Sequence, residues 1–157
     1  MPSLDRHVQS RRPAPLNEHV RRQMQTMPRK DTGAELELRR QLHRLGLRFQ
    51  VNVRSLPGCP DIVFTRAKLA IFVDGCFWHR CPDHGTSPKN NRAWWAAKLD
   101  ENVARDRRKD DQLREMGWAA VHIWEHEDAV TAAATIRTLW QYSTGRSASS
   151  SPFAEPI

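Results

Sequence analysis

The chain of 157 residues lacks a long hydrophobic run and contains only three cysteines. No apolar run approaches the ~20 residues that a membrane-spanning helix needs, and residues 1–12 lack the apolar segment of a secretory signal. The three cysteines form no obvious disulfide framework, so we interpret them as thiols or metal ligands. We therefore expect a cytoplasmic protein without a membrane segment.

Basic side chains outnumber acidic ones by 25 to 18, which gives a formal net charge of +7. This balance favours a polyanionic partner, most simply nucleic acid, although a generally basic surface has the same composition. Hydrophobic residues make up 39% of the chain, enough for one globular domain. We predict a basic, partly mobile N-terminal arm over residues 1–30 that is helical over 17–27, one globular domain over 31–142 and a disordered tail over 143–157.

The pattern of apolar residues predicts a compact α/β fold with a mixed β-sheet flanked by helices. Thr32 and Glu35 match a capping box, in which Thr32 is the N-cap and the Glu35 carboxylate reaches back to it. Two short apolar runs are expected to pair as a central hairpin. The predicted elements after the arm are a helix over 32–45, a half-buried strand over 49–53, the hairpin strands over 62–64 and 69–73, a helix over 94–116, a strand over 118–124 and a helix over 128–140.

A segment of eleven residues directly after the second hairpin strand concentrates two cysteines, two histidines and two carboxylates. Cys76, Cys81 and His84 suit a tetrahedral zinc site, which usually takes four thiolate and imidazole ligands. His126 is the candidate for the fourth ligand, and His122 is its rival in mid-strand. Such a site would be structural, and the alternative is a loop with reduced cysteines. A zinc deaminase is excluded because the chain has no Pro-Cys-x-x-Cys element.

Carboxylates stand at the ends of the two predicted hairpin strands. Asp61 opens one strand and Asp74 ends the next, so both could reach one hard cation such as Mg²⁺. Glu35 could join them from the first helix. The alternatives are a turn-closing hydrogen bond for Asp61 and the capping box for Glu35. His79, left free if zinc takes its neighbours, could be a general acid or base, although a lone histidine is more often a surface residue.

Two pairs of adjacent aromatic residues lie in or next to polar, basic loops. They are Phe77-Trp78 and Trp94-Trp95. Aromatic side chains surrounded by arginine and lysine can stack on bases or insert between base steps and kink the duplex. The alternative is that one residue of each pair belongs to the core.

Several short motifs occur in a fixed order along the chain. They are Pro57-Gly58-x-Pro60-Asp61, Asp74-Gly75-Cys76-Phe77-Trp78-His79, Trp94-Trp95, Asn102-Val103-x-Arg105-Asp106-Arg107-Arg108, Gly117-Trp118 and Trp124-Glu125. In this order and approximate spacing, over about residues 20–140, the chain resembles the very-short-patch repair (Vsr) DNA mismatch endonucleases. The segment 75–79 is the most specific part of the resemblance.

The resemblance implies a restriction-endonuclease-like fold of the PD-(D/E)xK type, a structural Zn²⁺ and a catalytic Mg²⁺. It implies nicking of the thymine strand 5′ to the T of a T:G mismatch left by deamination of 5-methylcytosine, with general mismatch-repair proteins as further partners. Carried over by position, the expected catalytic residues are Asp61, His79, Glu35 and Asp106; the Mg²⁺ ligands are Asp61, the backbone carbonyl of Val73 and, as an additional candidate, Asp74; and the DNA-contacting residues are Phe77, Trp78, Trp95, Lys98, Asn102 and Arg105.

The chain departs from the family pattern at two positions. Some members carry a histidine where this chain has Asp74, and the late zinc ligand is often a cysteine where this chain has His126; imidazole can replace thiolate at zinc. Two other functions stay open, namely a restriction-type endonuclease that cuts paired DNA and a non-catalytic, zinc-stapled DNA-binding module. We expect a monomer, because no extended exposed apolar helix suggests a dimer.

Overall fold

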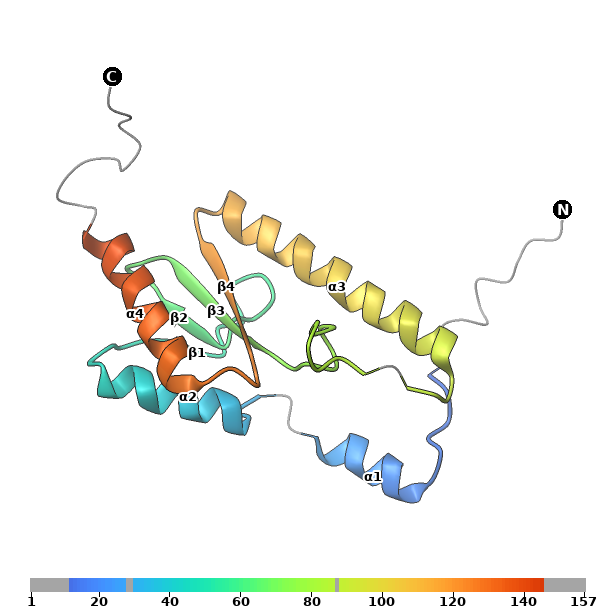
Figure 1. Ribbon diagram of the computed structural model, residues 1–157. Helices are drawn as coiled ribbons and strands as arrows, with labels where there is room; N and C mark the ends of the chain where they lie inside the picture. The colour runs from blue at the N-terminus through green and yellow to red at the C-terminus, as the bar shows by residue number, and fades with distance from the viewer. Residues whose placement is uncertain (1–11, 28–29, 87, 146–157) are drawn as a thin grey trace, which may run out of the picture.

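The computed structural model describes residues 12–27, 30–86 and 88–145. None of the helices in these ranges combines the length and apolar character needed to cross a membrane. The α/β class and the order of elements predicted after the arm are confirmed. In chain order the elements are α1 (Glu18–Thr26), α2 (Gly33–Arg44), β1 (Gln50–Val51), β2 (Ile62–Phe64), β3 (Leu69–Asp74), α3 (Arg92–Glu115), β4 (Ala119–Trp124) and α4 (Ala129–Gly145) (Figure 1).

The described strands form one mixed sheet in the order β1-β2-β3-β4. β2 and β3 pair antiparallel, which confirms the predicted hairpin, and β1 pairs antiparallel with β2. β4 instead pairs parallel with β3, in a register that places Phe72 beside His122 and Asp74 beside Trp124. The long helix α3 is therefore the crossover that carries the chain from the end of β3 back to the start of β4.

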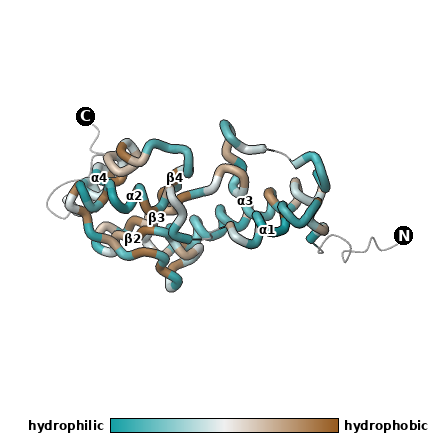
Figure 2. The backbone as a smooth tube through the Cα atoms, turned by 90° about the horizontal axis from the view of Figure 1, so that it is seen from below, coloured by the Kyte–Doolittle hydropathy of each residue, from teal (hydrophilic) through white to brown (hydrophobic). Residues whose placement is uncertain are grey.

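The two faces of the sheet have different neighbours because side chains alternate along a strand. Ile62, Ile71 and Ile123 lie on the face that packs against α2 and α4. The opposite face, which carries Phe72 and His122, lies toward α3. In Figure 1, α2 and α4 lie on one side of the strands and α3 on the other, and in Figure 2 the apolar colouring gathers along β2 and β3. The main hydrophobic cluster therefore lies on the face toward α2 and α4. The face toward α3 also buries Val63, Ala70 and Leu113, but it carries polar side chains toward the end of β3 and is called the polar face below.

β1 is shorter and more exposed than predicted. It contains only two residues, and both are exposed, so the prediction of a half-buried strand over 49–53 was wrong. The regular strand ends at Val51, because Asn52, with a φ of 49°, lies in the left-handed region. The amides of Asn52 and Val53 still donate to the carbonyls of Asp61 and Pro60 at 3.1 Å. Phe49 nevertheless packs inward, with its ring 5.8 Å from that of Phe64.

The ends of the chain extend the predicted boundaries only slightly. The predicted helix in the arm is present as α1, with Asn17 as its N-cap, where the side chain accepts a hydrogen bond from the amide of Val20 at 2.9 Å. α4 continues to Gly145, so the predicted tail boundary at residue 142 falls within its last turn. The predictions for residues 1–11 and 146–157 lie outside the described residues.

Candidate active site and metal centre

A cleft of about 500 Å³ lies between the polar face of the sheet and α3. It brings together all of the catalytic residues that the resemblance implied, although they come from α2, the turn before β2, the end of β3, the loop after it and α3. Its lining residues are Lys30, Glu35, Asn52, Arg54, Gly58, Cys59, Asp61, Phe72, Val73, Asp74, His79, Arg105, Asp106, Lys109, Asp110 and His122.

Asp61 lies just before β2, opposite the end of β3. Its Oδ2 atom accepts a hydrogen bond from the amide of Val73 on β3 at 2.7 Å, a cross-strand bond and not one that closes the turn before it, and the carboxylate lines the cleft. Burial raises the pKa of Asp61 to about 6, against the hydrogen bond from Val73, and the nearby Glu35 and Asp74 raise it further. A carboxylate that burial and like charges hold against ionisation is an environment that a bound cation would relieve.

Glu35 joins the cleft from the first turn of α2 and is buried. Thr32 caps the helix as predicted, since its hydroxyl accepts from the amide of Glu35 at 3.3 Å. The reciprocal half of the capping box differs, because the Glu35 carboxylate accepts from the amide of Asp31 at 2.7 Å and not from that of Thr32. Its second partner is the guanidinium of Arg39, at 3.4 Å. Glu35 is therefore both a helix-end residue and part of the cleft wall.

His79 and Asp106 form the closest polar pair in the cleft. The Nδ1 atom of His79 lies 2.5 Å from the Oδ2 atom of Asp106 on α3, and its Nε2 atom lies 4.0 Å from the Oδ1 atom of Asp74. The carboxylate of Asp106 accepts from Nδ1, which leaves Nε2 to face the cleft. Such an orientation suits a histidine that takes a proton from a water molecule in the cleft.

His122 and Asp110 also line the cleft, and neither was predicted there. The Nδ1 atom of His122 lies 2.6 Å from Asp74, and its Nε2 atom lies 2.9 Å from both carboxylate oxygens of Asp110. The hydrogen bond to Asp74 is the main cause that raises the pKa of His122 to about 9. Asp110 raises this pKa as well, and burial opposes the shift. Asp110 could have been found from its place one helical turn after Asp106.

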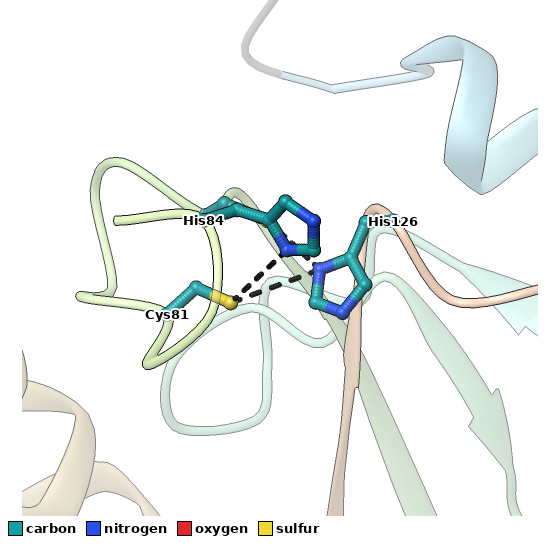
Figure 3. A group of neighbouring side chains, drawn as sticks. Cys81, His84 and His126 are labelled. Carbon is teal, nitrogen blue, oxygen red and sulfur yellow. Dashed lines mark hydrogen bonds between the residues drawn. The ribbon is translucent and has the colours of Figure 1, made fainter. Parts of the chain in front are cut away.

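A second cluster lies beyond the end of β3, where Cys76, Cys81, His84 and His126 bring one ligand atom each within 4.8 Å of one another. The Sγ atom of Cys76 lies 3.1 Å from the Nδ1 atom of His126, and that of Cys81 lies 3.7 Å from it and 3.9 Å from the Nδ1 atom of His84. In Figure 3 the two imidazoles converge on the Cys81 sulfur, one from the loop and one from the turn after β4. The predicted four residues therefore meet, and the rival His122 does not join them.

The donor set and spacing of this cluster fit zinc. Zinc–sulfur and zinc–nitrogen bonds of about 2.3 and 2.0 Å in a tetrahedron separate sulfur from nitrogen by roughly 3.5 Å, close to the distances between these atoms. Burial raises the pKa of the Cys76 thiol to about 11, and the neighbouring Cys81 adds to this. The Cys76 thiol would need a cation beside it to ionise at neutral pH.

The loop that carries the cluster is tied down at both ends. The Glu125 carboxylate accepts from the amide of Cys76 at 3.1 Å, and the Glu125 amide donates to the carbonyl of Asp74 at 2.9 Å. At the other end, the amide of Gly85 donates to the carbonyl of Cys81 at 2.9 Å. A Cβ atom on Gly85 would lie 2.5 Å from that carbonyl oxygen, so the turn requires glycine.

The aromatic residues predicted to contact DNA form one group beside this loop. The rings of Phe77, Trp78 and Trp95 have centroid separations of 5.0, 5.4 and 5.9 Å, and Trp94 lies 4.9 Å from Trp95. Phe77 and Trp78 are partly exposed, whereas Trp95 is only 8% exposed and supports them from below. Phe77 and Trp95 also line a hollow of about 880 Å³ that residues 12–16 and α1 close from the other side.

The three polar residues of α3 that were expected to contact DNA occupy different environments. Arg105 is exposed and lines the cleft. Lys98 is partly exposed and forms an ion pair with Glu101 at 3.2 Å. Asn102 is only 5% exposed, and its amide donates to the backbone carbonyl of Trp78 at 3.3 Å. Asn102 therefore supports the aromatic loop in this structure, and its contact with DNA stays a prediction.

Asn102→Ala should lower the free energy of unfolding by about 1–2 kcal/mol, because it removes the side-chain amide that donates to the part-buried carbonyl of Trp78. Denaturant unfolding of the purified variant measures this cost. A direct phosphate contact would instead leave stability unchanged and would reduce the salt dependence of DNA binding. Lys98→Ala is the matched control on the same helix and should be nearly neutral in the unfolding assay, because its ion pair is exposed.

Comparison with known proteins identifies relatives over most of the chain. A family model described as DNA mismatch endonuclease Vsr matches residues 16–83. The type II nicking enzyme V.NaeI of Lentzea aerocolonigenes is 44% identical over 135 residues, which cover 83% of this chain and 81% of the relative. The type II nicking enzyme V.XorIIP of Xanthomonas oryzae pv. oryzae is 41% identical over 66% of this chain and 77% of the relative.

The DNA mismatch endonuclease Vsr of Escherichia coli strain K12 is 38% identical over 103 residues, which cover 65% of this chain and 66% of the relative. The match of the family model extends from α1 to the cysteine-rich loop, and the match to V.NaeI is longer still. Both agree with the resemblance drawn from the motifs around Asp61 and His79. The chain belongs to the Vsr family of DNA mismatch endonucleases.

Proposed function

We propose that this protein is a Mg²⁺-dependent endonuclease that nicks the thymine strand of duplex DNA 5′ to the T of a T:G mismatch and so starts very short patch repair. The observation that carries the proposal is the meeting of Asp61, Asp74 and the His79–Asp106 pair in one cleft beside exposed basic side chains. Membership of the Vsr family supports a DNA endonuclease as the general activity. A monomer, with general mismatch-repair proteins as occasional partners, remains our expectation for its assembly.

Asp61, the carbonyl of Val73 and Asp74 would hold the Mg²⁺ ion, because oxygen ligands of this kind suit a hard cation. The bound ion would neutralise the phosphate and lower the pKa of water in the cleft. The amide of Val73 donates to the Oδ2 atom of Asp61 and so orients this carboxylate in the cleft.

His79 would act as the general base. Held by Asp106 through Nδ1, it presents Nε2 to a water molecule and accepts its proton as the water oxygen bonds to phosphorus and the bond from phosphorus to the leaving oxygen breaks. Arg105 and Lys109, which line the same cleft, would attract and orient the phosphate backbone. Glu35 would add negative charge to the cleft beside Asp61, which favours a bound cation.

His79→Ala should lower kcat about 100-fold or more, the contribution typical of a general base. Asp106→Asn should also lower kcat, by a smaller factor, because it weakens the orientation of the imidazole but leaves it in place. Single-turnover nicking at saturating enzyme measures both. Asp111→Asn, on the exposed side of α3, is the matched control and should leave the rate unchanged. Equal rates for His79→Ala and the unmodified protein would exclude His79 as the base.

The exposed part of the aromatic group would open the duplex. Phe77 and Trp78 could insert between base steps, where apolar side chains unstack the bases and kink the duplex. Trp95 contacts Phe77 and would support both rings during this insertion. A mismatched pair costs less to unstack than a paired one, so this step would contribute to selection of the mismatch. The zinc cluster would hold the loop that carries both the wedge and His79.

Nicking of a labelled duplex with a single T:G pair, in a set of flanking sequences and with Mg²⁺, tests the proposal. We expect a nick on the thymine strand that is absent from the fully paired duplex. Cutting of the paired duplex as well would establish a restriction-type endonuclease instead. Tight mismatch binding without any cutting in every context would leave a DNA-binding module.

A further inference from the structure

Both ring nitrogens and one ring face of His122 make contacts in the cleft. Its Nδ1 atom lies 2.6 Å from the Oδ2 atom of Asp74, and its Nε2 atom lies 2.9 Å from Asp110 on α3. One ring face stacks on Phe72, with centroids 5.0 Å apart and planes 12° apart. A surface histidine seldom has both nitrogens and a ring face engaged, so the arrangement indicates a built feature of the cleft.

Asp74 stands between this histidine and His79. It is 7% exposed, its Oδ2 atom contacts His122, and its Oδ1 atom lies 4.0 Å from the Nε2 atom of His79. The terminal torsion of an aspartate is soft and roughly two-fold, so an unrestrained carboxylate would turn. The contact with His122 on one oxygen therefore determines the direction in which the other oxygen points.

The register of the sheet explains why these groups meet. In the parallel β3–β4 pair Phe72 lies beside His122, and Asp74 follows on the same face two residues later. Helix α3 then presents two aspartates one turn apart, Asp106 to His79 and Asp110 to His122. The cleft thus contains two histidine–aspartate pairs, and Asp74 connects them.

We propose that His122 is a positioning residue for the nicking reaction. Backed by Asp110, it holds the carboxylate of Asp74 so that one oxygen stays turned toward His79 and the cleft. His122 acts through Asp74 and does not touch the scissile phosphate. This inference deepens the proposed function and rests on it for the reaction that is positioned.

Substitutions at residue 122 separate the two ring nitrogens. His122→Asn places an amide nitrogen where Nδ1 lies and can still donate to Asp74, whereas His122→Gln reaches toward the place of Nε2 and Asp110. We expect His122→Asn to keep the single-turnover nicking rate within about threefold, and His122→Gln and His122→Ala to lose about 10- to 100-fold in kcat with KM little changed, as for residues that orient a metal ligand. His43→Asn, on α2 and outside the cleft, is the matched control and should be neutral.

A second measurement does not depend on nicking. The ¹⁵N-detected imidazole spectrum of His79, assigned with His79→Asn, reports the surroundings of its ring nitrogens. We expect this signal to move in His122→Gln and His122→Ala and to stay in place in His122→Asn, with melting temperatures recorded for all three.

The outcomes distinguish the two proposals. An unmodified protein that nicks no mismatch, together with the expected spectra, would overturn the proposed function and retain the positioning of Asp74. Rates that fall equally in all three variants, or that fall only as far as the melting temperature falls, would overturn the positioning role. An unchanged His79 signal in all three variants would overturn it as well, whatever the rates.

Discussion

Asp61→Ala should reduce mismatch nicking at least about a thousandfold. The substitution removes the principal proposed ligand of a metal ion, and an ion of this kind contributes several kcal/mol to the transition state; about 4 kcal/mol corresponds to about a thousandfold in rate. Single-turnover nicking of the T:G duplex in Mg²⁺ measures the loss. The same assay in Mn²⁺ shows whether a metal with higher affinity for oxygen and nitrogen ligands restores part of the rate.

Loss of activity through unfolding is the outcome that this experiment must separate. The pKa of Asp61 is raised to about 6 by burial, above the ~3.9 of an unfolded chain. Ionisation of Asp61 therefore lowers the stability of the metal-free protein, a cost that develops between about pH 4 and pH 6 and is fully present above about pH 6. We expect the melting temperature of Asp61→Ala at pH 8 without added Mg²⁺ to be equal to or higher than that of the unmodified protein. A fall of many degrees would make the activity result uninformative about metal binding, and Asp61→Asn would then replace it.

Removal of zinc should have the second large effect. The four proposed ligands come from the loop and from the turn after β4, so a zinc ion held by them would contribute its binding free energy to folding. We expect a strong chelator to lower the melting temperature by about 10 °C, since a loss of about 3 kcal/mol in a domain of this size shifts it by about 3 °C per kcal/mol. Nicking should be lost with it, because His79 lies on the same loop.

Metal analysis and a matched pair of cysteine variants complete this test. The purified protein should contain one zinc per chain, and Cys81→Ser should lower both the zinc content and the melting temperature. Cys59→Ser is the control, because Cys59 is an exposed thiol outside the cluster and its substitution should change neither. A zinc-free protein with full stability and full activity would rule out the structural metal site.

The sequence predicts most elements of this fold because they have strong local signals. The apolar runs that became β2 and β3 are too short and too hydrophobic to be anything but buried strands, and Thr32 marks the start of α2 by its capping chemistry. The prediction for β1 was wrong in length and burial because Asn52 adopts a left-handed conformation, which ends the regular strand although the alternating pattern continues. The alternation of apolar and polar residues does not report the backbone conformation at which a strand ends.

The site divides along the same line. Cys76, Cys81 and His84 are close in sequence, and this spacing alone indicated a metal cluster. His122 and Asp110 were not predicted in the cleft, because their meeting depends on the parallel pairing of β4 with β3 and on the rotation of α3 above it. Residue spacing places Asp110 one helical turn after Asp106, but it gives neither the strand pairing nor the helix rotation that bring His122 to it.

β4 and the turn after it are the last parts that the cleft and the cluster need. β4 supplies His122, and the turn supplies Glu125, which ties down the loop, and His126, which completes the ligand set. A nascent chain emerges from its N-terminus, so Asp61 and His79 leave the ribosome long before β4, the strand that completes the cleft. We expect a chain interrupted within α3 to be inert. Incomplete chains released during translation would then not nick the DNA of the cell that makes them.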